Sequence, residues 1–140
     1  MAGARLGFAL ASRELTADLE KIKYSTNPYS VNRITLAAGE AAVKDADYYR
    51  ANCAKIISTR EKTAKALRCM GFEMTDSKAN FLFARYPMMS GKEIFARLKE
   101  SGILVRRFDQ AGIEDYLRIT VGSESEMETL VNTLERIVGK

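Results

Sequence analysis

Three arginines lie beside or inside short apolar runs, where their charge is conspicuous. Arg5 precedes the run 6–11, Arg106 ends the run 103–105, and Arg118 lies between Leu117 and Ile119. A buried arginine needs an anionic partner, and its planar guanidinium suits carboxylates and phosphates. The alternative is that each arginine lies on the solvent side of its strand, as alternation predicts for Arg118. These three residues are our candidate anion-binding groups.

The remaining residue types point to no further chemistry. Histidine is absent, which excludes histidine triads and histidine-containing metal sites within this chain. There is no glycine-rich loop followed by Lys-Ser/Thr, and the acidic residues resemble helix caps and surface groups. We therefore predict no catalytic residue and no metal site. The residues alone indicate an anion-binding α+β domain.

Composition indicates one ordinary globular region. Of the 140 residues 46% are hydrophobic, and no apolar run approaches the roughly 20 residues of a membrane span. We expect no signal peptide, no membrane association and a cytoplasmic location. Cys53 and Cys69 fall in one helical pattern, where sixteen residues rise about 24 Å, too far for a disulfide. We predict both to be reduced packing residues.

The net charge of +4 is mildly basic. The densest basic stretch, 50–68, contains Arg50, Lys55, Arg60, Lys62, Lys65 and Arg68. We interpret it as the solvated face of a helix, because no aromatic residues are interleaved through it to stack on bases. A nucleic-acid-binding domain is the alternative that this stretch alone would favour.

Residues 1–45 predict a strand and two helices without an obvious core of their own. The strand covers 5–11, and a helix starts at Ser12 or Arg13. Asn27-Pro28-Tyr29-Ser30 predicts a turn, and a helix rich in alanine and glycine follows from about 31 to 44. The small residues of this second helix indicate close packing.

Residues 46–140 predict a small α+β domain. The expected order is a long helix to Met70, strands at 72–74 and 79–86, a helix at 90–101, strands at 103–106 and 116–121, and a last helix after Ser123. In the second strand Phe81 and Phe83 share one face, opposite Leu82 and Ala84. The pattern predicts an antiparallel sheet with helices on one face.

Five stretches resemble the fold-type I pyridoxal-phosphate aminotransferases, and within them the histidinol-phosphate aminotransferase group. They are Ala2-Gly3-Ala4-Arg5-Leu6-Gly7-Phe8-Ala9, Asn27-Pro28-Tyr29-Ser30-Val31-Asn32, Ala79-Asn80-Phe81-Leu82, Gly102-Ile103-Leu104-Val105-Arg106 and Leu117-Arg118-Ile119-Thr120-Val121-Gly122. The order and spacing of the five are specific, and they span nearly the whole chain.

The resemblance assigns roles to the three arginines. It implies that Arg5 contacts the phosphate of the cofactor, pyridoxal 5'-phosphate. It implies that Arg118 binds the anionic end of the amino-acid substrate and that Arg106 assists. Asn80 and Tyr29 match motif positions without an implied contact. By the same resemblance, 1–45 are a remnant of the large cofactor-binding domain and 46–140 are the small C-terminal domain with its connecting helix.

One departure from the family limits what we expect of this chain. The family carries a Ser-Lys pair shortly before the A-G-x-R segment, and that lysine forms the Schiff base with the cofactor. Here the first lysine is Lys21, within a predicted helix. The family's aspartate for the pyridine nitrogen and its ring-stacking aromatic residue are also missing. We expect a C-terminal part of such an enzyme that binds no cofactor and is inactive by itself.

The implied reaction of the whole enzyme is amino transfer between histidinol phosphate and 2-oxoglutarate, in histidine biosynthesis, by a homodimer. The second hypothesis is a stand-alone, non-catalytic module that binds an anionic metabolite or a partner protein. We also expect segment 5–11, as an apolar strand without neighbours, to self-associate or to be disordered.

Overall fold

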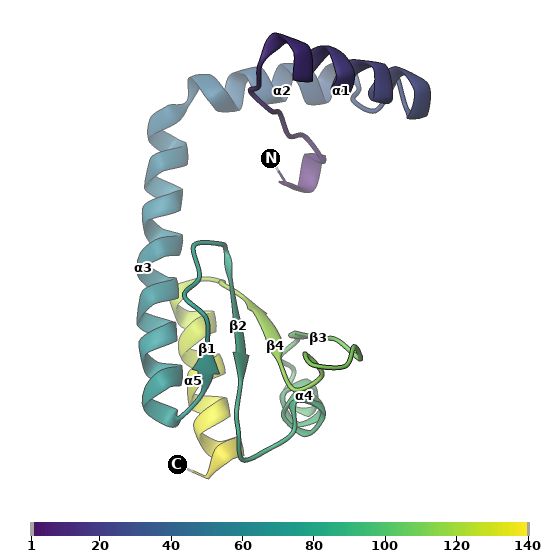
Figure 1. The fold of residues 1–140 in the computed structure, drawn as a ribbon. Helices are drawn as coiled ribbons and strands as arrows, with labels where there is room; N and C mark the ends of the chain where they lie inside the picture. The colour runs from purple at the N-terminus through teal and green to yellow at the C-terminus, as the bar shows by residue number, and fades with distance from the viewer. Residues whose placement is uncertain (1, 140) are drawn as a thin grey trace. The chain divides into compact units, whose positions relative to one another are not determined.

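The computed structural model describes residues 2–139 and divides the chain into two compact units (Figure 1). The first unit covers 1–50 and the second 51–140. The boundary falls inside one continuous helix, α3, which runs from Ala46 to Met70.

The first unit is helical. It contains a short 3₁₀ helix, η1 (Ala2–Ala4), and the helices α1 (Arg13–Thr26) and α2 (Arg33–Lys44). Ser12 and Asn32 are the N-caps of α1 and α2, and their side chains accept hydrogen bonds from the amides of Leu15 at 3.3 Å and Thr35 at 2.8 Å. Both predicted helices are confirmed, because each begins with a side chain that satisfies an otherwise unpaired amide.

The predicted strand at 5–11 is wrong. Residues 6–11 form no regular structure, and Phe8 and Leu10 are 79% and 92% exposed. A strand needs a neighbour for its backbone groups, and none of the described residues pairs with this segment. Leu6 instead packs on α2, where a Cβ on Gly39 would lie 2.1 Å from Leu6 Cδ2. The close packing expected of the small-residue helix is thus made by Leu6.

The second unit is an antiparallel sheet with helices packed against it. The strands are β1 (Glu73–Met74), β2 (Phe81–Arg85), β3 (Arg106–Arg107) and β4 (Leu117–Thr120), in the order β1-β2-β4-β3. The helices are α4 (Gly91–Glu100), α5 (Glu124–Val138) and the C-terminal part of α3. The predicted α+β architecture with an antiparallel sheet is confirmed, although β3 begins three residues later than the sequence suggested.

One face of the sheet carries the core. The sheet contributes four buried side chains to this core: Leu82, Ala84, Leu117 and Ile119. They cluster with buried residues of the helices. From α3 these are Ala64, Leu67 and Met70, from α4 Ile94 and Leu98, and from α5 Met127, Leu130 and Leu134. The alternate residues of β2 and β4 are therefore left on the opposite, open face.

Helix ends in the second unit match their sequence signals. Ser90 caps α4, and Ser123 and Glu126 form the predicted reciprocal capping box at the start of α5. Gly71 and Gly102 follow α3 and α4 with φ of 97° and 77°, a left-handed conformation that glycine adopts without steric cost.

Two further sequence expectations concern the whole chain. Cys53 and Cys69 are free thiols, but Cys69 is exposed and is not a packing residue. Among residues 2–139, no helix combines the length and the apolar character that crossing a bilayer would require.

Candidate anion-binding site

Arg118 lies at the centre of the open face of the sheet. It belongs to β4, where Leu117 and Ile119 on either side point into the core, so its own side chain is exposed. Alternation along the strand thus places the charge in solvent, as the sequence suggested. Arg118 stands opposite Phe83 on β2, and its guanidinium lies 5.8 Å from the ring centre of Phe81.

Arg106 is the direct neighbour of Arg118 on the other side. The Cα atoms of the two residues are register partners in the β3–β4 pair, so both side chains emerge on the same face. The structure therefore brings together two of the three predicted arginines. Residues opposite one another in an antiparallel pair have Cβ atoms about 4.5–5.5 Å apart, which lets two guanidiniums reach one anion.

Aromatic rings surround these two arginines. The rings of Phe83 and Tyr116 stack with centres 4.7 Å apart, and Phe108 meets Phe83 edge-on at 6.2 Å. Phe108 also lies under both guanidiniums, 5.5 Å from that of Arg106 and 5.9 Å from that of Arg118. The site is thus a cationic surface on a partly buried aromatic base, which attracts the guanidiniums by cation–π interaction.

The charges of the two arginines are not neutralised within the described part of the chain. Arg106 and Arg118 form no ion pair there, whereas other arginines of the second unit do. Arg85 pairs with Glu73 at 2.7 Å, and this hydrogen-bonded carboxylate raises the pKa of Arg85. Arg107, next to Arg106, pairs with Asp109 and donates to the Glu114 carbonyl at 3.0 Å. Arg106 and Arg118 are therefore the pair with charge to spare for a ligand.

Arg5 belongs to the first unit. It follows η1 with φ of 55°, an uncommon left-handed backbone conformation for a residue other than glycine, and its side chain is exposed. Arg5 is therefore open to a ligand, and its predicted contact with the cofactor phosphate stays a prediction.

The residues of this chain do not by themselves fit pyridoxal 5'-phosphate. Arg5 is the single charged side chain in the first twelve residues. Lys21, the first lysine, lies within α1, is 78% exposed and is paired with Asp18 at 3.0 Å. An exposed surface lysine of this kind is not enclosed in a pocket that could activate it for covalent chemistry. Arg5 is thus the single residue among the first twelve that is predicted to contact the cofactor phosphate.

The basic stretch on α3 is a mixture of paired surface groups and one buried residue. Lys62 and Arg68 pair with Glu124 and Asp76, and the contact with Glu124 raises the pKa of Lys62 and lowers that of Glu124. Arg60 is only 6% exposed and donates to the Ala79 carbonyl at 3.0 Å. The prediction of a solvated face is therefore wrong for Arg60, whose position next to the 75–80 loop buries it.

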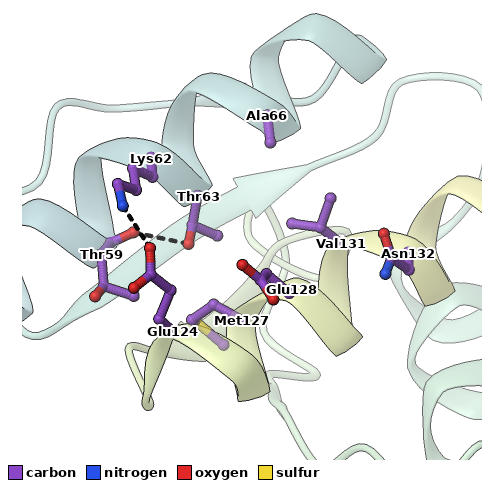
Figure 2. A pocket seen from close by; sticks show the side chains of 9 residues that line it. All are labelled: Thr59, Lys62, Thr63, Ala66, Glu124, Met127, Glu128, Val131 and Asn132. Carbon is purple, nitrogen blue, oxygen red and sulfur yellow. Dashed lines mark hydrogen bonds and ion pairs between the residues drawn. The ribbon is translucent and has the colours of Figure 1, made fainter.

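A shallow groove of about 190 Å³ lies between α3 and α5, with Thr59, Thr63, Met127 and Val131 among its lining residues (Figure 2). The Lys62–Glu124 pair borders it. Its lining is mostly apolar and carries no unpaired arginine, so it lacks the chemistry of the open face. Among residues 2–139, no group of three cysteine, aspartate or glutamate side chains could hold a metal ion.

Sequence reasoning missed the aromatic half of the site. Phe81 and Phe83 were placed together on one strand face, but their position beneath Arg118 depends on the pairing of β2 with β4. Phe108 lies two residues after Arg106, in an alternating pattern that would put both on one side. That spacing is the signal in the sequence that could have connected the ring to the arginine.

Comparison with known proteins places this chain in a family. The profile for "Aminotransferase class I and II" matches residues 1–134. The histidinol-phosphate aminotransferase of Chromohalobacter salexigens is 46% identical over 137 residues, which are 98% of this chain and 39% of that protein. That of Brachyspira hyodysenteriae is 41% identical over 138 residues, 99% of this chain and 39% of the relative. The chain thus spans about two fifths of these relatives.

Solved structures share the fold. The histidinol-phosphate aminotransferase of Sinorhizobium meliloti, in complex with pyridoxal-5'-phosphate, superposes with a TM-score of 0.81 at 26% identity, covering 99% of this chain and 38% of that one. The Erwinia carotovora structure described as a putative histidinol-phosphate aminotransferase gives a TM-score of 0.83 at 22% identity, over 98% and 38%. With the match along 1–134, these findings show that the chain belongs to the class I and II aminotransferase family.

Proposed function

We propose that this chain is the substrate-anion-binding part of an aminotransferase that transfers an amino group between histidinol phosphate and 2-oxoglutarate. Pyridoxal 5'-phosphate supplies the electron sink for such transfers when it is bound. The observation that carries the proposal is the register pair Arg106–Arg118, with two unneutralised guanidiniums on one face. Both substrates present an anion that such a pair holds: a phosphate in one and carboxylates in the other.

The strand positions support the roles proposed for Arg118 and Arg106, and the family resemblance supports that of Arg5. Arg118 lies on β4, which pairs with both β2 and β3, and it is the principal anion ligand. Arg106 lies on the edge strand β3 and is the second ligand. Arg5 holds the cofactor phosphate in the complete enzyme. In this proposal residues 1–45 are a part of the large cofactor-binding domain, and 46–140 form the small domain.

A titration tests the anion-binding role. The 140-residue chain, uniformly labelled with ¹⁵N, is titrated with histidinol phosphate and with 2-oxoglutarate, and the arginine Nε–Hε signals are followed by NMR. We expect saturable shifts at Arg106 and Arg118 that Arg118→Gln abolishes. Lys99→Gln removes an exposed cation on α4 and is the control. Shifts that survive Arg118→Gln, or no saturable shifts at all, would contradict the proposal.

The chain by itself is proposed to be inactive in transamination, because it contributes no lysine suited to the cofactor. Mixing it with pyridoxal 5'-phosphate and borohydride, followed by mass spectrometry, tests this. Covalent cofactor on Lys21 would contradict it. The homodimer and the cytoplasmic location belong to the same proposal for the whole enzyme, and sedimentation of the complete protein tests the first.

The second candidate is a stand-alone module that binds an anionic metabolite or a partner protein without catalysis. It rests on the same two arginines. Reading the genomic DNA upstream of codon 1 separates the two hypotheses: an in-frame Ser-Lys shortly before Met1 supports the aminotransferase, and a stop codon with a ribosome-binding site supports the module. Nucleic acid is the weaker alternative, since Lys62 and Arg68 of the basic stretch are already paired.

A further inference from the structure

The ring of Phe108 is shared by the two arginines of the open face. Its centre lies 5.5 Å from the Arg106 guanidinium and 5.9 Å from that of Arg118. Both distances lie within the range of about 6 Å in which a cation is attracted by an aromatic face. Phe81 lies near Arg118 at 5.8 Å, but only Phe108 contacts both cations among the described rings.

The shared ring counteracts the repulsion between the two positive charges of the site. Arg106 and Arg118 are register partners, and like charges directly opposite one another on neighbouring strands repel. No aspartate or glutamate of residues 2–139 forms an ion pair with either of them. Long, exposed side chains with the same charge would separate unless something held them. A ring attracted to both guanidiniums opposes that separation.

Phe108 is itself fixed. It is half-buried and meets Phe83 edge-on, with ring centres 6.2 Å apart and planes at 68°. Phe83 in turn stacks on Tyr116 at 4.7 Å, with planes at 13°. The three rings come from β2, from the residue directly before β4 and from the loop after β3. The guanidiniums therefore rest on a support that the sheet itself positions.

We propose that Phe108 is a positioning residue that holds Arg106 and Arg118 together, so that they bind one phosphate or carboxylate as a single bidentate site. The inference rests on the proposed function, because it assumes that these two arginines bind an anion. It adds that their cooperation depends on a third residue that need not touch the ligand. Preorganisation of this kind lowers the ordering cost that binding must overcome.

The test uses inorganic phosphate as the probe and the full 140-residue chain. Phosphate affinity is measured by isothermal titration calorimetry in the wild type, Phe108→Leu, Phe108→Tyr and Phe95→Leu, and the arginine Nε–Hε signals locate the site in the wild type. We expect Phe108→Leu to weaken phosphate binding about threefold to tenfold, because both guanidiniums lose their cation–π contact with the ring. Phe108→Tyr should bind within about twofold of wild type, since tyrosine keeps the aromatic face.

Phe95→Leu is the matched control. Phe95 is a half-buried phenylalanine on α4 that packs against the core, and no arginine of the described residues lies over its ring. It should leave the phosphate affinity unchanged. If Phe108→Leu does not keep the wild-type fold by circular dichroism, Phe108→Met, whose longer and more flexible side chain can fill an irregular gap, takes its place.

A second readout separates positioning from mere support of the fold. In the wild type, Arg106→Gln and Arg118→Gln should be non-additive, because either change removes the bidentate site. In the Phe108→Leu background the two changes should become additive. Wild-type affinity in Phe108→Leu, with unchanged non-additivity, would overturn this inference and leave the proposed function standing. An absence of phosphate binding by the wild type would overturn both.

Discussion

Arg106 and Arg118 face each other as register partners across β3 and β4, with no acidic side chain of the described residues paired to either. Two like charges in this position oppose the pairing of their own strands. The arrangement that suits this face to an anion therefore lowers the stability of the fold. Such a loss is common where a site must stay unneutralised for its ligand.

A double-mutant cycle measures that cost. Arg106→Gln and Arg118→Gln, alone and together, should show a repulsive coupling in the free energy of unfolding of about 0.2–1 kcal/mol. Screening should reduce the coupling at 1 M salt, where the Debye length is about 3 Å. Chemical denaturation at low and high salt is the measurement. An attractive coupling would show that the ring beneath the pair outweighs the repulsion.

Gly91 is predicted to be intolerant of any side chain. It is buried at the start of α4, and a Cβ there would lie 2.6–2.7 Å from backbone atoms of Asp115, whose carboxylate accepts a hydrogen bond from the Gly91 amide at 3.0 Å. Gly91→Ala should destabilise the second unit by about 1–3 kcal/mol, the usual cost of overpacking. Thermal unfolding followed by circular dichroism measures this.

Gly7→Ala is the control for the glycine prediction, since a Cβ at Gly7 would meet nothing within 4 Å. It should change the unfolding temperature little. Because Asp115 precedes Tyr116, we also expect Gly91→Ala to perturb the NMR signals of the Tyr116 ring. A variant as stable as wild type with unshifted Tyr116 signals would refute the crowding argument.

Arg60 is predicted to stabilise the second unit through one partly buried hydrogen bond. Arg60→Met keeps the aliphatic stem but leaves the Ala79 carbonyl without its donor, which should cost about 1–3 kcal/mol. Arg68→Met is the matched control, because Arg68 is an arginine of the same helix that is about half exposed. Its surface ion pair with Asp76 should contribute under about 1 kcal/mol to stability. Equal losses in urea denaturation would count against the burial of Arg60.

Acid should weaken α5 at its N-terminus. Hydrogen bonds from the Ser123 hydroxyl and amide, both at 2.7 Å, lower the pKa of Glu126. A carboxyl whose folded pKa is depressed stabilises the fold above its unfolded pKa of about 4.3, and the contribution is lost as the pH falls through the folded value. Glu126→Gln should thus be less stable than wild type at pH 7 and approach it below pH 4.

Urea midpoints from pH 7 to pH 3 would show this convergence. Glu135→Gln, which removes one carboxylate from the same helix outside the capping box, controls for the change in net charge. If the difference in stability between wild type and Glu126→Gln stayed constant with pH, the negative charge of Glu126 would not be what stabilises the capping box.

Local signals predicted much of the fold, and non-local pairing explains what they missed. Ser12, Ser90 and Ser123 mark helix starts because a cap depends only on the next three residues. The segment 5–11 has the composition of a strand, but strand formation depends on a partner that composition does not show. Arg60 looked like one more cation on a helix, and only the fold brings the Ala79 carbonyl to it.

The candidate site shows the same division. Alternation placed Arg118 on the side away from Leu117 and Ile119, which the structure confirms. The pairing of Arg118 with Arg106 joins residues twelve positions apart, and its proximity to Phe81 crosses to a strand further back in the chain. Sequence could therefore identify the charged residues, while their arrangement as one surface required the strand register.

The unit boundary inside α3 has a consequence for how the chain orders itself. The buried residues of this helix all lie between 60 and 70, while Tyr48 and Tyr49 near its start are 69% and 65% exposed. Starting a helix is unfavourable, but extending an existing one adds a hydrogen bond for each residue fixed. We therefore expect the packed half to nucleate α3 and the turns near residue 46 to propagate from it. Amide hydrogens should exchange with deuterium in a gradient, fastest toward Ala46 and slowest around Leu67.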